Sequence, residues 1–255
     1  MEIRSKIALI TGANRGLGFE IARQLGKRQI KVLIGARNAA AGQAAVDGLI
    51  AEGIDALFIL LDITKTNSID KAVRIVTEKF GYLDILVNNA ARLPKATDSG
   101  LPSQVSQELL LEFMETNFIA QVNVTQSFLP LIKQSAAGRI VNMSSSIGSV
   151  TISSEHLHQN GPKPPRIPYA ASKAALNMFT VILAKELRQD GIKVNSADPG
   201  LTQTDAGGPN APYTVEQGAR PAVWLACLDD DGPTGCFFTH VEEHQWRNRD
   251  LRSGY

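Results

Sequence analysis

Short apolar segments alternate with helix-like segments along the chain, and this alternation constrains the fold more than any other feature. In the first half, we expect strands at 6–11, 31–36, 56–62 and 84–90, separated by helices at 15–28, 38–52 and 68–80. Continuous apolar runs of this length are typical of parallel strands that helices bury on both faces. The sequence therefore predicts an α/β fold, a doubly wound (Rossmann) domain.

The second half of the chain continues this alternation. We expect helices within 107–133, 168–189 and 215–228, and strands at 139–144, 193–197 and 235–239, which complete a parallel seven-stranded sheet. No linker or change of composition divides the chain. Residues 1–255 are therefore predicted to form a single domain, with a cofactor half of about 1–135 and a catalytic and substrate half of about 136–255.

Two segments interrupt the alternation. Residues 151–167 contain three prolines, a glycine and two histidines, and residues 203–214 are rich in glycine and proline. Both fit plain surface loops. Each follows a strand that ends near the site described below, and functional groups concentrate on loops that a sheet positions. We therefore expect them to form the rim of a ligand cleft.

A glycine cluster follows the first predicted strand. Residues 11–18 read TGANRGLG and open the first predicted helix. Glycine lets the backbone turn sharply and approach a pyrophosphate, and a helix N-terminus offers unpaired N–H groups to the anion. With a strand before it and a helix after it, the cluster predicts a dinucleotide site rather than a plain turn.

The end of the second predicted strand indicates which nucleotide binds. An acidic residue there would bind the ribose 2′-hydroxyl of NAD, but no Asp or Glu occurs between Lys31 and Val46. Arg37 stands there instead, and its planar guanidinium is suited to phosphate. Arg15, inside the glycine cluster, could reach the same 2′-phosphate. The sequence thus favours NADP(H). The alternative is that Arg37 is only an exposed charged residue at the end of a strand.

The next two strand ends also carry candidate cofactor contacts. Asp62 and Ile63 could bind the adenine edge through a carboxylate and an N–H, but a turn-forming or helix-capping aspartate fits equally well. The sequence NNAA at 88–91 ends the fourth strand. Its small residues would let a cofactor lie close to the backbone.

A tyrosine and a lysine are spaced for acid–base chemistry. Tyr169 and Lys173 stand four residues apart, which places them on one face of a helix. Lowering the pKa of a phenol from ~10 to ~7 requires about 4 kcal/mol. A unit charge ~4 Å away supplies about that much at an effective dielectric constant of ~20. Lys173 could therefore tune Tyr169 into a general acid.

Together these motifs resemble the short-chain dehydrogenase/reductase family. In chain order they are TGANRGLG at 11–18, NNAA at 88–91, Asn117 in ETN, SSSIG at 144–148, YAASK at 169–173 and DPG at 198–200. The resemblance covers essentially the whole chain. The segment ARNAAAGQAAVDGL after the second strand is most similar to that of NADPH-dependent carbonyl reductases.

The resemblance implies a role for each catalytic candidate. Tyr169 would donate the proton to the carbonyl oxygen, and Lys173 would lower the pKa of Tyr169 and bind the nicotinamide ribose. Ser145 would bind the substrate oxygen and stabilise developing charge. Ser144 and Ser146 are the alternatives if the register shifts by one.

The resemblance also implies a proton path and a cofactor lining. Asn117 would hold a water that links Lys173 to solvent. The residues expected to line NADP(H) are Thr11, Gly12, Asn14, Arg15, Gly16, Leu17, Gly18, Arg37, Asp62, Ile63, Asn89, Ala90, Tyr169, Lys173, Pro199, Gly200 and Thr204.

The implied activity is reversible NADPH-dependent reduction of a ketone or aldehyde to an alcohol. Reduction of an imine or quinone, or epimerisation through a keto intermediate, would use the same residues. A different class of protein, a non-catalytic NADP(H) sensor, would keep the fold and lose turnover. The family's tetramer is in doubt, because the segment before Tyr169 is extended as in carbonyl reductases, some of which are monomeric. A homodimer, a homotetramer and a monomer therefore all stay open.

Composition excludes several other partners. The formal net charge is +1, so no global field favours nucleic acid or an anionic membrane. No apolar stretch approaches the ~20 residues that span a bilayer, and no signal peptide is visible. We expect a cytoplasmic protein that acts on a small molecule. We expect no metal either: HVEEH at 240–244 and HLH at 156–158 resemble metal motifs, but neither has a complete ligand set.

Overall fold

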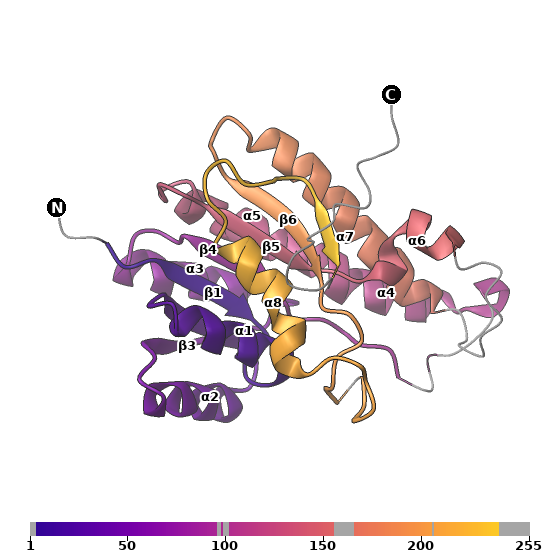
Figure 1. The fold of residues 1–255 in the computed structure, drawn as a ribbon, viewed down its shortest axis with the longest axis horizontal. Coiled ribbons are helices and arrows are strands. Elements are labelled where there is room, and N and C mark those ends of the chain that lie inside the picture. Colours follow the sequence, from indigo (N-terminus) through magenta and orange to yellow (C-terminus); the bar gives the residue numbers. More distant parts are fainter. Residues whose placement is uncertain (1–3, 96–97, 99–101, 156–165, 206, 240–255) are drawn as a thin grey trace.

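Seven parallel strands form one sheet in the order β3-β2-β1-β4-β5-β6-β7 (Figure 1). The computed structural model describes residues 4–95, 98, 102–155, 166–205 and 207–239. The strands are β1 (Ile7–Thr11), β2 (Lys31–Ala36), β3 (Ala56–Leu60), β4 (Ile85–Asn88), β5 (Arg139–Met143), β6 (Lys193–Asp198) and β7 (Phe237–Thr239). The predicted parallel seven-stranded sheet is confirmed.

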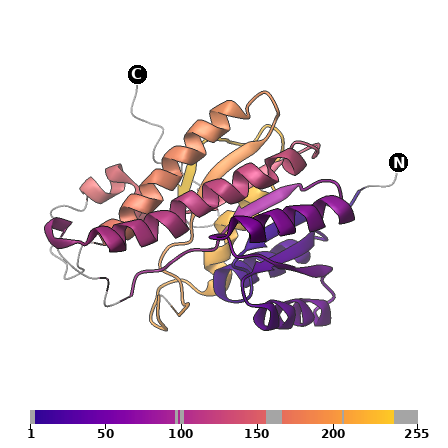
Figure 2. The same cartoon turned by 180° about the vertical axis from the view of Figure 1, so that it is seen from behind.

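Helices cover both faces of the sheet (Figures 1 and 2). One face carries α1 (Gly16–Gly26), α2 (Ala39–Ala51) and α8 (Val215–Ala226), and the other carries α3 (Thr66–Lys79), α5 (Ala120–Ile132) and α7 (Ile167–Glu186). Successive side chains of a strand point to opposite faces. In β1, Ala8 and Ile10 accordingly join one apolar core, and Ile7 and Leu9 join the other. This two-sided burial explains the continuous apolar runs.

The strand order marks one edge of the sheet as the candidate ligand site. The chain builds β1, β2 and β3 outward in one direction and then returns to place β4 on the other side of β1. In such sheets a crevice opens at the carboxyl ends of the strands where the order reverses. The glycine cluster after β1 and the small residues after β4 therefore meet at this point.

Three local expectations needed correction. The helix expected within 107–133 is α4 (Gln107–Met114) followed by a π-helical turn at Glu115–Ile119 and then α5. The segment 151–167 is not wholly a loop, because α6 spans Val150–Glu155; residues 156–165 lie outside the described part. Short 3-10 turns at Pro102–Gln104 and Ser146–Gly148 were not foreseen. Hydrophobic periodicity and composition do not predict changes of helix type that involve a single turn.

Helix α7 also corrects the expectation that no segment is long and apolar enough to span a membrane. The helix is 20 residues long and contains an 18-residue window with a mean hydropathy of 1.3, so it meets that requirement by length and composition. The core helix of a globular fold meets the same requirement. In α7, Leu176, Leu183 and Ala184 are buried, and the helix packs along β6 and β5. The apolar face of α7 is thus part of the sheet's covering layer.

A buried ladder of polar side chains crosses three neighbouring strands. Asn88 of β4, Asn142 of β5 and Ser196 of β6 stand in register. The amide of Asn88 donates to Asn142 Oδ1 and to Thr125 Oγ1, both at 2.8 Å. Asn142 donates in turn to Thr180 Oγ1, which lies 2.8 Å from Ser196 Oγ. These bonds fix α5 and α7 against the sheet near the carboxyl ends of its strands.

Replacing Asn142 with Ala should destabilise the fold, because it leaves Asn88 and Thr180 with fewer partners in a dry environment. We expect the free energy of unfolding to fall by about 2–3 kcal/mol in urea titrations. Gln43→Ala, which removes an exposed bond to Asp47, should cost less than about 0.5 kcal/mol. Equal losses in both variants would show that the ladder adds no stability.

Candidate active site

Two glycines allow the strand ends at the switch point to pack closely. Gly12 has a φ of +64°, and a Cβ there would lie 2.8 Å from Ala90 Cα. A Cβ on Gly18 would lie 2.4 Å from Asn89 Nδ2. The hydroxyl of Thr11 accepts from the Asn89 and Ala90 amides at 2.9 and 3.0 Å. The loops after β1 and β4 therefore form one fixed surface.

The start of α1 fits an anionic group. The helix begins at Gly16, and its N-cap residue Arg15 makes no side-chain capping bond. No acidic residue stands in the first turn. The first N–H groups of a helix have no intrahelical partner and attract anions. Asn14 and Leu17 lie half-buried on either side of this turn. The glycine loop thus meets the chemical needs of a pyrophosphate.

Two arginines lie near the same end of the sheet. Arg37 is exposed immediately after β2, and within the described residues no hydrogen bond or ion pair engages its side chain. Arg15 pairs with Asp205, and both side chains are more than three-quarters exposed, at 76% and 79%. An ion pair so exposed contributes little free energy. Both guanidinium groups are therefore accessible to a phosphate.

Asp62 has a structural task. Its Oδ1 accepts from the backbone N–H and the hydroxyl of Thr64, at 3.0 and 2.7 Å, and its own N–H donates to Ser68. These are the contacts of an aspartate that organises a turn. Ile63 beside it is buried. The turn interpretation describes the observed contacts of Asp62, and contact with adenine stays a prediction.

Tyr169 lies in the first turn of α7, where it meets one serine of the SSSIG motif. Its hydroxyl interacts with the Ser145 side chain. Its ring lies edge-on to Phe113 of α4, with centroids 6.2 Å apart. Ser144 is buried, and its hydroxyl has no partner among the described residues, whereas the Ser146 N–H donates to Asp198. Of the three serines, Ser145 is the one that the structure brings to Tyr169.

Lys173 lies beneath Tyr169, with only 2% of its surface exposed. Its Nζ donates to the Met143 carbonyl at 2.7 Å and lies 5.6 Å from the centre of the Tyr169 ring. Gly148 permits this close packing, because a Cβ there would lie 2.6 Å from Lys173 Cβ. Burial lowers the pKa of Lys173 to about 8.

The expectation that Lys173 lowers the pKa of Tyr169 differs from what the structure shows. The pKa of Tyr169 is raised, first by burial and second by the charge of Asp198. Ser145 and Arg166 act in the opposite direction. The ammonium of Lys173 faces the Met143 carbonyl rather than the phenol. The phenol therefore holds its proton strongly in this state.

Asn117 lies in the π-helical turn and is fully buried. Its Oδ1 accepts from the Arg92 N–H at 2.7 Å, and its Nδ2 donates to the Arg92 carbonyl at 3.0 Å and to Ser172 Oγ at 3.3 Å. The π turn is a helix irregularity that is frequent at functional sites. Asn117 thus joins the loop after β4 to α7, next to Lys173.

The loop after β6 closes the other side of the site. Pro199, Gly200 and Thr204 are half-buried. A Cβ on Gly16 would lie 4.0 Å from the Thr204 methyl group, so this loop reaches across to the glycine cluster. A cofactor along the carboxyl edge of the sheet would lie between the two loops.

Sequence reasoning missed two residues of the site. Phe113, which is 1% exposed, supports the Tyr169 ring and stacks beneath the Arg92 guanidinium at 4.0 Å. Asp198 is buried at the end of β6, and its charge acts on Lys173. An apolar residue in a helix carries no signal of its contact partner. An acidic residue at the end of a buried strand does indicate a functional role, and Asp198 in the DPG motif at 198–200 is such a residue.

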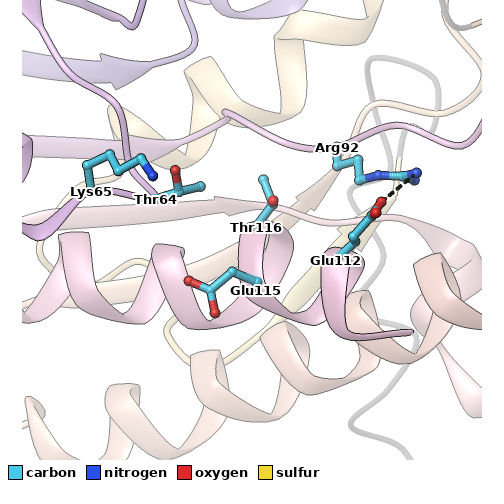
Figure 3. A pocket seen from close by; sticks show the side chains of 6 residues that line it. All are labelled: Thr64, Lys65, Arg92, Glu112, Glu115 and Thr116. Carbon is cyan, nitrogen blue, oxygen red and sulfur yellow. Dashed lines mark ion pairs between the residues drawn. The ribbon is translucent and has the colours of Figure 1, made fainter. Parts of the chain in front are cut away.

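A pocket of about 440 Å³ lies on the β3–β4 side of the site (Figure 3). Its lining is polar and consists of Thr64, Lys65, Arg92, Glu112, Glu115 and Thr116. In Figure 3 the Arg92 guanidinium points to Glu112, an ion pair of 3.0 Å. Tyr169 and Ser145 do not line this pocket. It therefore lies apart from the chemical centre.

The described residues contain no group of three or more His, Cys, Asp or Glu side chains that could hold a metal. The motifs at 156–158 and 240–244 lie outside the described residues.

A glycine loop at the switch point and a Tyr-Lys pair on helix α7 are the features of nucleotide-dependent α/β enzymes. The family described as short chain dehydrogenase matches residues 6–212, and the chain belongs to this family.

Individual relatives agree with this assignment. The carbonyl reductase [NADPH] 1 of Sus scrofa is 36% identical, and the match covers 96% of each chain. Among solved structures, NADPH-bound carbonyl reductase from chicken fatty liver is 27% identical with a TM-score of 0.79, over 93% of this chain and 97% of that one. Salutaridine reductase from Papaver somniferum is 28% identical with a TM-score of 0.79, over 91% and 99%.

Replacing Gly18 with Ala should damage the nucleotide loop, because the new methyl group would overlap Asn89 Nδ2 and the Gly12 carbonyl, at 2.4 and 2.6 Å. We expect the free energy of unfolding to fall by about 1–3 kcal/mol and the Kd for nucleotide, followed by fluorescence, to rise. Gly48→Ala in α2 meets no atom within 4 Å and should stabilise by about 0.5–1 kcal/mol. A Gly18→Ala protein with unchanged stability and Kd would contradict the close packing described.

Proposed function

We propose that this chain is an NADPH-dependent carbonyl reductase that reduces a ketone or aldehyde to an alcohol, reversibly. The observation that carries the proposal is the contact between Tyr169 and Ser145 above the buried Lys173, at the sheet edge that holds the glycine loop. The names of the relatives, which include carbonyl reductases and an NADPH-bound structure, support the same activity.

The residues of this chain would handle the oxygen and the proton. NADPH, when bound, supplies a hydride to the carbonyl carbon. Ser145 and Tyr169 would both donate to the carbonyl oxygen, which fixes its position and stabilises the negative charge that develops on it. The Tyr169 proton would then pass to that oxygen, which is general acid catalysis. Lys173 and Asn117 would resupply the proton from solvent.

The cofactor is NADP(H), and Arg37 is the proposed phosphate contact. Its exposed guanidinium follows β2, the strand next to the glycine loop. Arg15 would add a second donor once its pair with Asp205 opens. We propose the same cofactor-lining residues as the sequence predicts. The glycine loop would bind the pyrophosphate, and Pro199, Gly200 and Thr204 would lie at the nicotinamide. Residues 1–135 would thus serve the cofactor and 136–255 the substrate.

The substrate is proposed to be a small molecule, and the protein to be cytoplasmic. The same proton donor would serve an imine or a quinone, so a substrate panel followed at the NADPH absorbance should include both. A non-catalytic NADP(H) sensor would need none of the contacts among Ser145, Tyr169, Lys173 and Asn117. Light scattering after size exclusion distinguishes a monomer from a dimer or a tetramer.

Replacing Tyr169 with Phe removes the proton donor and keeps the ring that packs on Phe113. We expect turnover of every active carbonyl substrate to fall by about 10²-fold or more, with an unchanged Kd for NADPH. Tyr82→Phe, which removes a hydroxyl bonded to the Ser5 carbonyl, should retain turnover. An active Tyr169→Phe enzyme would rule out the proposed donor.

Replacing Arg37 with Ala should weaken NADPH more than NADH, because only NADPH carries the 2′-phosphate. Loss of hydrogen bonds to a charged group predicts a rise in the NADPH Kd of about ten- to hundredfold, with little change for NADH. Arg74→Ala removes another exposed arginine, from α3, and serves as the control. Equal losses for both nucleotides would remove the basis for the Arg37 assignment.

A further inference from the structure

Asp198 is a buried carboxylate that the proposed reaction does not use. It ends β6, is 4% exposed, and lies among groups that form the chemical centre. A buried carboxylate is costly unless hydrogen bonds and charges compensate it. Its contacts therefore indicate what it does.

Two backbone amides point at this carboxylate from two different loops. The Ser146 N–H donates to Oδ2 at 2.9 Å, and the Gly200 N–H donates to Oδ1 at 2.9 Å. Ser146 directly follows Ser145, and Gly200 belongs to the loop that borders the proposed nicotinamide site. One side chain thus fixes the turn that carries the substrate-binding serine relative to the loop that faces the cofactor.

The charge of Asp198 also acts on the two titratable groups of α7. Lys173 donates to Met143, which pairs in register with Ala197, so its ammonium lies at the strand ends where Asp198 stands. The carboxylate raises the pKa of Lys173 and, to a lesser extent than burial, that of Tyr169. Arg166, just before α7, is the remaining charged group that acts on Tyr169 within the described residues.

We propose that Asp198 is a positioning residue that joins the Ser145 turn to the Gly200 loop, and that its charge, at the strand ends where the Lys173 ammonium lies, is the counter-ion that keeps this lysine charged. Without this carboxylate, burial would favour the neutral amine. The same negative charge raises the pKa of Tyr169, so its removal should let the phenol lose its proton at a lower pH. The kinetic part of this inference rests on the proposed function, and the part about Lys173 does not.

Asp198→Asn tests the proposal with little change in shape. Its amide can accept from one of the two N–H groups but presents a donor to the other, so one loop is released. We expect kcat for carbonyl reduction to fall about tenfold or more, and the rise of alcohol oxidation with pH to begin at a lower pH. Asp231→Asn removes the same charge from an exposed turn and should leave both unchanged.

A second measurement uses the protein without cofactor. Because the folded-state pKa of Lys173 is about 8, below its ordinary 10.5, the unfolded chain binds more protons between these values, and this group makes the free energy of unfolding rise with pH there. In Asp198→Asn this rise should begin at a lower pH than in the wild type and in Asp231→Asn. Urea titrations from pH 6 to 10.5 measure it.

The outcomes are separable. An Asp198→Asn enzyme with the kcat and pH dependence of the wild type would overturn the proposal. A reduced kcat would also overturn it if alcohol oxidation and the free energy of unfolding both begin to rise at the same pH as in the wild type. If the wild type reduces no carbonyl compound, the proposed function fails, while the unfolding titration still decides the counter-ion role. If Asp198→Asn does not fold, Asp198→Glu, which keeps the charge, decides. The proposal is supported if kcat is reduced while the free energy of unfolding begins to rise at the same pH as in the wild type. It is overturned if this rise begins at a lower pH.

Discussion

The parallel direction of all seven strands is the constraint on which the rest of this structure depends. Because every strand ends at the same edge, residues far apart in the chain meet there: Thr11 at the end of β1, Asn89 after β4, Ser145 after β5 and Asp198 at the end of β6. No single segment contains a site. The sheet creates one by aligning its carboxyl ends, and helix α7 brings Tyr169 and Lys173 to the same place.

Close backbone packing and buried polar contacts hold this edge together. Gly12 and Gly18 allow the loops after β1 and β4 to touch, and Thr11 ties them with its hydroxyl. Asn117 uses a π-helical turn to link the loop after β4 to α7. Thr11 and Asn117 are buried with hydrogen-bond partners, which makes these links rigid and expensive to disturb. A hydride and a proton can be delivered to one carbon–oxygen bond only if such positions are fixed.

The electrostatics of the site follow from burial more than from the Tyr-Lys spacing. The i, i+4 spacing predicts that the two side chains share a face, and it does so correctly. It does not predict that the ammonium bonds to Met143, or that the charge of Asp198 acts on it. The sequence predicted a lowered pKa for Tyr169, whereas the structure raises it. Local spacing contains no information about desolvation or about charges from other strands.

The sequence by itself determined the class of the fold, the order of its strands and helices, and the positions of the glycine loop and of the YAASK segment, because periodicity and turn chemistry are local properties. Tertiary structure alone decided which of three serines meets Tyr169, that Asn117 lies in a π turn, and that Asp198 joins two loops. These depend on the exact distance and angle between elements that lie tens of residues apart in the chain. Packing sets such geometry, and no window of sequence contains it.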